Sequence, residues 1–251
     1  MAEQGFAPQD LDFEDAYQGK SPIGDTMPWD IERPQPAVVA LADSGQIAGE
    51  VLDIGCGLGD NAAFLASRGF RVTGVDGAPT AISVARERAA AKGLEIDFAV
   101  GDATRLDGFE HRFDTVLDSA LYHCLTEEQR RDYVAALYRA TRPGARLHLF
   151  CFSEEVPPAF PVPFRISERN LRETIGPQWT ITRLAPAVYD TSASKEQMIT
   201  TLRVVRPELD APATALDGLT MREAGRLLGI PTGTVKTRLM RARAELREAL
   251  A

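Results

Sequence analysis

Apolar and polar positions alternate along the first 205 residues in a pattern typical of a mixed α/β protein. Short apolar runs of strand length recur at 51–54, 70–75, 96–100, 113–117 and 145–151. Helical patterns at about 60–68 and 80–92 separate the first of these runs, and another helix is expected at about 36–44. Alternating strands and helices predict a largely parallel sheet. The last strands are expected near 179–189 and 198–205.

The turn after the first strand is the most informative segment. It reads Asp53-Ile54-Gly55-Cys56-Gly57-Leu58-Gly59-Asp60, with glycine at every second position and a helix after it. Glycine adopts positive φ angles and has no Cβ, so a ligand can approach the backbone while N–H groups of the helix point toward it. A dinucleotide-binding turn would instead read G-x-G-x-x-G. A tight strand-to-helix turn without a ligand is the alternative interpretation.

Acidic residues follow the next three strands at their ends. Asp76 ends the second strand, Asp102 follows the third, and Asp118-Ser119 follows the fourth. Because the carboxyl ends of parallel strands meet at one edge of the sheet, these side chains are predicted to surround one ligand, and Asp76 to accept its ribose hydroxyls. Taken singly, each acid also suits a helix cap or a solvated turn.

The D-x-G-x-G-x-G turn resembles motif I of the class I methyltransferases that use S-adenosylmethionine, and the resemblance covers about residues 9–205. It implies a doubly wound, mostly parallel, seven-stranded Rossmann-like sheet with one late antiparallel strand. It also implies that the glycines lie under the methionine and ribose portions of the cofactor and that Asp102 faces the adenine. The predicted cofactor-binding residues are Asp53, Gly55, Cys56, Gly57, Gly59, Asn61, Asp76, Gly77, Asp102, Ala103, Asp118 and Ser119.

Composition agrees with an enzyme of this kind. The 251 residues, 44% of them hydrophobic and 25% charged, suffice for one large domain and a small one. No apolar run approaches the roughly 20 residues of a membrane span, and the first residues lack the pattern of a signal peptide. We therefore expect a cytoplasmic protein. Cys56, Cys124 and Cys151 show no metal-ligand spacing, which predicts reduced thiols and no metal site.

Charge divides the chain into two parts. The net charge is −8, of which residues 213–251 contribute +3 and residues 1–212 contribute −11. After the linker at 207–212, helices at about 220–228 and 234–249 predict a helix-turn-helix. The predicted domains are 1–208, a methyltransferase domain with residues 1–45 as cap, and 209–251, a linker and helix-turn-helix tail.

Residues 219–243 resemble region 4 of the small extracytoplasmic-function sigma factors. In that family the second helix lies in the DNA major groove, and Lys236, Arg238 and Arg241 match its DNA-facing positions. A working sigma factor is not expected, because the upstream half of region 4 is degraded and nothing resembles the polymerase-binding region. The tail is interpreted as a hairpin packed on the enzyme or on a second subunit, as a weak DNA contact, or as a remnant of a gene fusion. The rival function is a DNA-binding regulator that senses S-adenosylmethionine.

The acceptor side is predicted from two apolar segments. Residues 17–36 resemble the cap of small-molecule methyltransferases related to thiopurine, tellurite and quinone methyltransferases, and residues 152–164 form a proline- and phenylalanine-rich loop. The predicted substrate-binding residues are Tyr17, Trp29, Phe160 and Phe164. Trp29 as an anchor of the N-terminus and 152–164 as a packed surface loop are the alternatives. The favoured acceptor is a small aromatic or quinone-like molecule, methylated on oxygen; the oligomeric state is left open.

A histidine after the fourth strand is the predicted catalytic base. An oxygen nucleophile must lose its proton, and a histidine of near-neutral pKa can take it. His123 is the first candidate and Tyr122 the second; a His123 that caps a helix or packs in the core is the alternative. Methylation of DNA bases is disfavoured, because 118–121 does not read Asn/Asp-Pro-Pro-Tyr.

Overall fold

A computed structural model of the chain describes residues 11–20, 27–157, 162–192 and 197–205. The chain divides into two units, Met1–Pro207 and Glu208–Ala251, and every described residue belongs to the first. The predicted helix-turn-helix, with Lys236, Arg238 and Arg241, lies outside the described residues, and so does Phe160.

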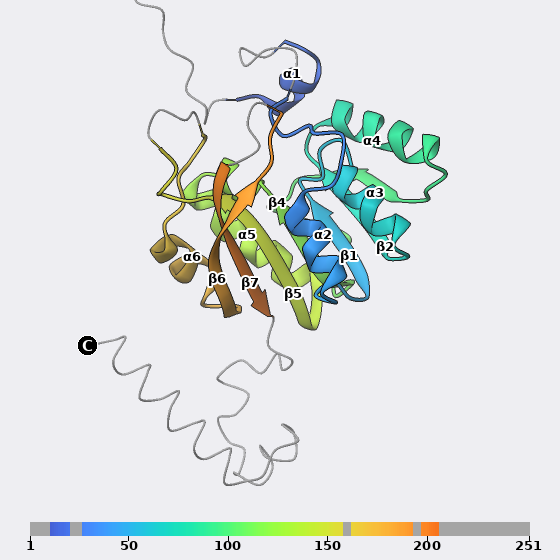
Figure 1. Cartoon of the computed structure of the whole chain (residues 1–251). Helices are drawn as coiled ribbons and strands as arrows, with labels where there is room; N and C mark the ends of the chain where they lie inside the picture. Colours follow the sequence, from blue (N-terminus) through green and yellow to red (C-terminus); the bar gives the residue numbers. More distant parts are fainter. Residues whose placement is uncertain (1–10, 21–26, 158–161, 193–196, 206–251) are drawn as a thin grey trace, which may run out of the picture. The chain divides into compact units, whose positions relative to one another are not determined.

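Helices cover a central sheet in the first unit (Figure 1). The elements follow in the order α1 (Phe13–Tyr17), α2 (Pro36–Asp43), β1 (Glu50–Ile54), α3 (Asp60–Ser67), β2 (Arg71–Asp76), α4 (Pro79–Ala91), β3 (Asp97–Val100), β4 (Phe113–Ser119), the 3₁₀ helix η2 (Tyr122–Cys124), α5 (Glu127–Ala140), β5 (Thr141–Phe152), α6 (Glu168–Ile175), β6 (Thr180–Tyr189) and β7 (Gln197–Val205).

The strands lie in the order β3-β2-β1-β4-β5-β7-β6. The first five are parallel, and β7 runs antiparallel between β5 and β6. This confirms the predicted α/β architecture with a parallel core. The strand order reverses between β1 and β4, and in sheets of this kind a crevice for ligands forms at that point, outside the carboxyl ends of the strands.

Two apolar layers form the core, one on each face of the sheet. Leu52 and Ile54 of β1 pack with α5 and α6 on one face, whereas Val51 packs with α2, α3 and α4 on the other. Neighbouring residues of a strand point to opposite faces, so this division is what a doubly wound sheet requires. Within the described residues, no helix combines the length and the apolar character needed to cross a membrane.

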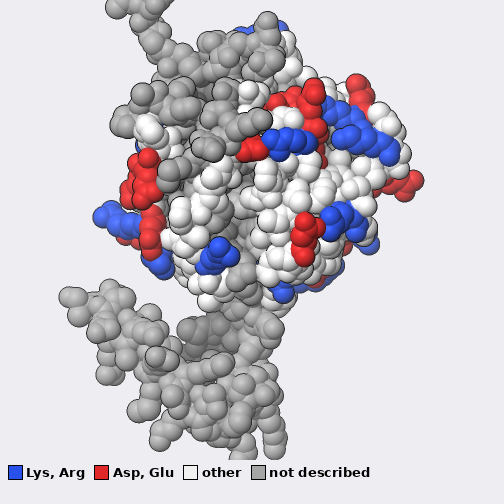
Figure 2. Space-filling model, viewed as in Figure 1, with Lys and Arg blue, Asp and Glu red and all other residues white. Residues whose placement is uncertain are grey.

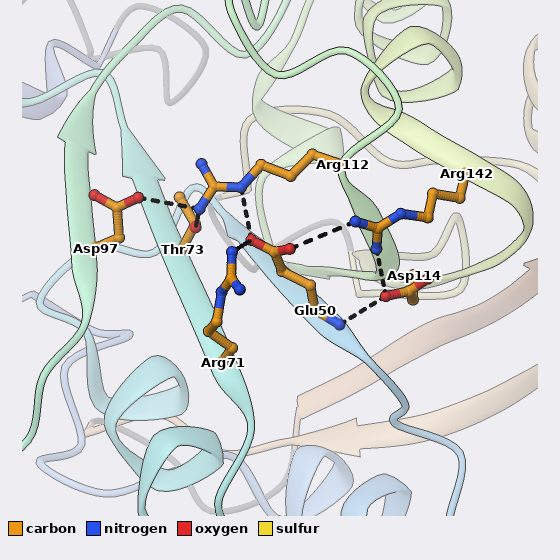
Figure 3. A network of polar contacts seen from close by, with 7 residues as sticks. All are labelled: Glu50, Arg71, Thr73, Asp97, Arg112, Asp114 and Arg142. Carbon is orange, nitrogen blue, oxygen red and sulfur yellow. Dashed lines mark hydrogen bonds and ion pairs between the residues drawn. The ribbon is translucent and has the colours of Figure 1, made fainter.

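A polar network joins the amino ends of the parallel strands (Figure 3). Glu50, the first residue of β1, accepts hydrogen bonds from Arg112 (2.6 Å) and Arg71 (3.0 Å) and lies 3.6 Å from Arg142. Arg142 also pairs with Asp114 at 2.6 Å. The network therefore lies at the edge of the sheet opposite the carboxyl ends, away from the crevice.

β5 begins four residues earlier than its apolar run predicts. Thr141 already pairs with Phe113, and the register shifts between Phe113 and Thr115. The segment that follows contains Pro143 and Gly144, and Gly144 has a φ of 81°. Proline and glycine resemble a turn in the sequence, but an irregularity in the ladder accommodates them within the strand.

Candidate functional site

The glycine turn after β1 requires glycine for both conformation and space. Gly57 and Gly59 have φ angles of 53° and 82°, in the left-handed region. A Cβ on Gly57 would lie 2.9 Å from the hydroxyl oxygen of Tyr17, and one on Gly59 would lie 2.9 Å from Phe98. Gly59 is also the N-cap of α3. The turn therefore brings bare backbone and the start of α3 to the crevice.

Asp76, at the end of β2, holds this turn in place. Its Oδ2 accepts a hydrogen bond from the Gly57 N–H at 2.8 Å, and its Oδ1 accepts one from the Ala78 N–H at 2.9 Å. Burial raises the pKa of Asp76, although these backbone donors oppose the rise. A carboxylate oxygen can accept a second hydrogen bond. Asp76 can therefore organise the turn and accept hydroxyl groups of a ligand at the same time.

A cavity of about 1220 Å³ lies over the carboxyl ends of β1–β6. Its wall includes the end of each of these strands, from Ile54 to Tyr189, together with the cap residues around Trp29. The sequence-predicted site residues that line it are Tyr17, Trp29, Gly55, Cys56, Gly57, Gly59, Asn61, Asp76, Gly77, Asp102, Ala103, Ser119 and His123. The volume exceeds the roughly 300–1,000 Å³ of a typical small-molecule site, so there is room for two ligands side by side.

Asp53 and Asp118, which were predicted to contact the cofactor, lie behind the cavity wall and are not among its lining residues. Both side chains are fully buried. Neither oxygen of Asp53 has a hydrogen-bond partner of standard geometry, and burial with the nearby Asp76 and Asp118 raises its pKa to about 7. Asp118 accepts hydrogen bonds from the Leu121 N–H (2.8 Å) and the Tyr133 hydroxyl (2.8 Å). Both acids therefore lie in the protein interior next to the cavity wall, and Asp118 holds the start of η2 and the Tyr133 side chain of α5 by its hydrogen bonds.

The N-terminal segment forms a cap on the cavity. Glu14 of α1 accepts hydrogen bonds from the backbone N–H and the hydroxyl of Thr80, at 3.0 and 2.6 Å, where α4 begins. The Trp29 indole donates to the Tyr17 hydroxyl at 2.9 Å. Arg88 pairs with Asp30 of the cap segment at 2.9 Å. Figure 2 shows acidic and basic side chains next to one another over this side of the molecule. Tyr17 and Trp29 of this cap both line the cavity.

His123 lines the cavity but is almost fully buried, with 4% of its surface exposed. Its ring lies 4.4 Å from the ring of Phe152 between centroids, and Nδ1 has no hydrogen-bond partner. Burial, assisted by the positive charge of Arg130, lowers the pKa of His123 to about 3. The imidazole is therefore neutral at physiological pH.

Tyr122 and Phe164, which were predicted as site residues, are not among the residues that line the cavity. The 3₁₀ turn of η2 directs the Tyr122 side chain into the core, where its hydroxyl donates to Asn170 at 3.1 Å. Burial raises the pKa of Tyr122 to about 12. The Phe164 ring lies against the guanidinium of Arg130, with 5.0 Å from Cζ to the ring centroid. Neither side chain touches the cavity from these positions.

Several wall residues were not predicted individually from the sequence, although Phe152 begins the loop at 152–164 that was expected on the acceptor side. Phe152 ends β5, Tyr189 ends β6, and Thr191 follows it. The Tyr189 hydroxyl lies 3.3 Å from the Ser119 hydroxyl. The signal for Phe152 and Tyr189 was available, because each stands at the carboxyl end of an expected strand. Gln129, a helical surface position by its neighbours in sequence, carried no such signal.

The parallel sheet, with a glycine turn after β1 and a cavity over its carboxyl ends, is typical of a class I methyltransferase fold. A family model described as a methyltransferase domain matches residues 51–144, and one described as sigma-70, region 4 matches residues 213–246. The chain is 39% identical over 183 residues to a 2-heptyl-1-hydroxyquinolin-4(1H)-one methyltransferase of Mycobacteroides abscessus, covering 71% of this chain and 80% of that protein. The chain belongs to the S-adenosylmethionine-dependent methyltransferases.

Two further similarities bear on the fold and the acceptor. A solved structure from work on the conversion of a disulfide bond into a thioacetal group during echinomycin biosynthesis has 38% identity and a TM-score of 0.73, covering 83% of this chain and 98% of the other. A demethylmenaquinone methyltransferase of Thermus thermophilus is 33% identical over 128 residues, which are 50% of this chain and 57% of that protein.

S-adenosylmethionine fits the residues present. Gly55, Gly57 and Gly59 bring backbone to the cavity wall, and the Asp76 carboxylate retains acceptor capacity for the two ribose hydroxyls. Asp102 lines the same wall beyond β3, with its Oδ1 bonded to the Thr104 N–H at 2.8 Å. The described cavity therefore has carboxylates beyond β2 and β3 that can accept hydrogen bonds from a nucleoside.

Proposed function

We propose that this enzyme transfers the methyl group of S-adenosylmethionine to an oxygen of a small aromatic or quinone-like acceptor. The observation that carries the proposal is one cavity whose wall contains both the glycine turn with Asp76 and a set of apolar side chains. The apolar side chains of the wall include Phe13, Trp29, Leu125 and Phe152. Flat apolar walls of this kind suit a ring better than a flexible polar molecule.

The residues have distinct proposed roles. Asp76 and the glycine turn hold the nucleoside and methionine portions of the cofactor, and Asp102 with Ala103 holds the adenine. The cofactor supplies a methyl group already activated on a sulfonium. Trp29 and Tyr17 close the site, which orients the acceptor and excludes water. His123 is the polar side chain that we propose to meet the acceptor.

The relatives support a ring acceptor. The names of two of them refer to a hydroxyquinolinone and to demethylmenaquinone. The echinomycin structure concerns sulfur chemistry, and it favours a thiol as the second candidate acceptor. A regulator that only senses the cofactor is not favoured, since the cavity has room for an acceptor as well.

A methylation screen tests the proposal. Hydroxyquinolines, quinols, catechols, thiols and amines are incubated with the full chain and isotope-labelled cofactor, and products are identified by mass spectrometry. We expect label on a ring hydroxyl, and at least about tenfold less label with the Asp76→Ala variant when the cofactor is below saturation. Labelling of thiols or amines alone would reject oxygen as the acceptor.

The domain boundaries also belong to this proposal. Residues 1–208 would form the enzyme, with 1–45 as its cap, and 209–251 the linker and helix-turn-helix. The match to sigma region 4 supports the identity of the tail. We propose at most a weak, salt-sensitive contact of Lys236, Arg238 and Arg241 with DNA.

A further inference from the structure

The cavity wall contains an imidazole, that of His123, which cannot easily take up a second ring proton. Nδ1 of His123 is buried without a partner, so Nε2 is the ring nitrogen that can meet a ligand. A neutral ring can donate one hydrogen bond from that nitrogen. Accepting a proton would instead create an imidazolium in a buried site beside another cation, which is costly.

That other cation is Arg130 of α5, which is 6% exposed. Its Nε donates to the Tyr122 carbonyl at 3.3 Å, while its Nη2 has no hydrogen-bond partner. The guanidinium lies between two rings, 5.3 Å from the Tyr122 centroid and 5.0 Å from that of Phe164. Among the described residues no carboxylate lies within ion-pair distance of it. Buried charges are normally paired with an opposite charge. Arg130 is therefore unusual, because it is buried without a counter-ion among the described residues.

The positive charge of Arg130 affects two residues of the cavity wall electrostatically. It contributes to the low pKa of His123 after burial, and it opposes the rise in the pKa of Cys124 that burial and Asp118 cause. Both residues line the cavity. The acids near this region are Asp76 and Asp118, which act on Cys124, and Glu127, which acts on Arg130 itself. For His123, however, Arg130 is the charged group that lowers the pKa of the imidazole.

We propose that the acceptor binds as an anion, with its ionised oxygen or sulfur against the neutral His123 ring and within the field of the buried Arg130. The proposal rests on the methyl transfer proposed above and names its substrate class: an apolar ring with an acidic hydroxyl or thiol, which ionises in water near neutral pH. It replaces the hypothesis that His123 is a general base. Arg130 is a positioning residue, since it does not itself line the cavity.

The transfer then balances without a protein base. The anion uses a lone pair to bond the methyl carbon while the bond from that carbon to sulfur breaks. The negative charge of the acceptor and the positive charge of the sulfonium cancel, and the products are a neutral ether or thioether and a neutral sulfide. The acceptor proton has already left to water before binding.

A chromophoric ligand tests the proposal without any methyl transfer. 4-Nitrophenol changes its absorption spectrum on ionisation, so its apparent pKa can be measured when it is bound to the full chain with S-adenosylhomocysteine. We expect the bound probe to titrate about one pH unit lower than in water, equivalent to tenfold tighter binding of the anion. Arg130→Met should abolish the shift, and Arg130→Lys should retain most of it.

A neighbouring arginine provides the matched control. Arg131 lies on the exposed face of α5 in a pair with Glu127, so Arg131→Met should leave the shift of the bound probe unchanged. A wild-type probe that titrates as in water, a probe that binds only when neutral, or an Arg130→Met variant that keeps the shift would each overturn the proposal.

A pH profile separates this inference from the proposed function. With two acceptors of different acidity, the rising limb of kcat/KM should move with the pKa of each acceptor. A limb that stays fixed for both acceptors would indicate a side-chain base and reject the anion. If the pKa of the bound probe is lowered but no hydroxyl is methylated, the result supports the anion site and rejects the proposed O-methylation.

Discussion

Asp76 is the residue from which most of the cofactor site can be tested. Its carboxylate bonds the turn backbone and faces the cavity. We predict that Asp76→Ala weakens binding of S-adenosylhomocysteine by about 1.5–3 kcal/mol, the usual effect of deleting a charged hydrogen-bond partner. Isothermal titration calorimetry measures the loss. Asp107→Ala, an exposed position paired only with Arg105, should bind as the wild type does, and equal binding by the Asp76 variant would disprove the assignment.

The buried carboxyl of Asp53 should make the free energy of unfolding depend on pH. Burial raises the pKa of Asp53 in the folded protein to about 7, from an ordinary value of 3.8. Between these values the unfolded chain has released a proton that the folded chain still holds, so stability falls as the pH rises through this window. We predict that Asp53→Asn is more stable than the wild type by about 1 kcal/mol or more at pH 8, and by less at pH 5.

Urea unfolding at both pH values tests this prediction. Asp132→Asn, a change on the exposed face of α5, should show no comparable dependence on pH. An Asp53 variant that gains nothing at the higher pH would mean that the carboxylate has a stabilising partner. A stability cost at this position agrees with a role beneath the cofactor site, because strained or charged groups tend to be retained where they serve function.

At the scale of single residues, the sequence predicts the strand ends well and side-chain directions poorly. Gly57, Asp76 and Asp102 follow apolar strands, and parallel pairing alone brings them together. Tyr122 and His123 are adjacent in sequence, yet η2 turns one into the core and leaves the other on the cavity. The charge state of His123 depends on Arg130, whose burial against Phe164 is a tertiary contact that no local pattern encodes.

At the scale of elements, the network around Glu50 fastens the amino ends of the strands. Glu50 is 9% exposed and is bonded by arginines from β2 and from the start of β4. We predict that Glu50→Gln lowers the free energy of unfolding by about 1–3 kcal/mol, since it leaves partly buried arginines without their carboxylate. Cofactor affinity should not change, because the cavity lies at the opposite ends of the strands.

Chemical denaturation and calorimetry on the same variant check both parts. Glu127→Gln breaks an exposed pair with Arg131 and should cost no more than about 0.5 kcal/mol. A Glu50 variant with native stability would show that the network contributes nothing net. Loss of cofactor affinity at native stability would contradict the separation of the two edges.

The parallel elements were predicted from hydrophobic pattern, and the deviations have local causes. β5 includes Pro143 and Gly144, which signal a turn in sequence but are accommodated at an irregularity in the β4–β5 ladder. The cap is different, since α1 has only five residues. A helix of that length has little stability alone, and its place depends on the bonds from Thr80 to Glu14. The hydrophobic pattern therefore predicts the strands and the longer helices. It does not predict α1, whose position depends on tertiary contacts.

At the scale of the whole molecule, the acidic enzyme unit and the basic tail have opposite tendencies toward DNA. Residues 1–212 carry −11 and residues 213–251 carry +3. On the described part of the face in Figure 2, acidic and basic side chains are interspersed, without a continuous basic patch. A body of this charge repels the phosphate backbone, and a few arginines in the tail attract it only weakly.

We predict that truncation after Asp210 leaves methyl transfer and cofactor affinity within about twofold, because the strand ends that form the described cavity all precede this residue. The full chain should bind a DNA duplex with a Kd of about 10⁻⁴–10⁻⁶ M at physiological salt, and the truncated chain should not bind it. Fluorescence anisotropy at about 50 and 200 mM salt measures this, and affinity should fall steeply between the two, since counterion release drives such contacts. Tight, sequence-selective binding that persists at the higher salt would instead favour a regulator that reads DNA through its region 4 segment and senses S-adenosylmethionine through its methyltransferase fold.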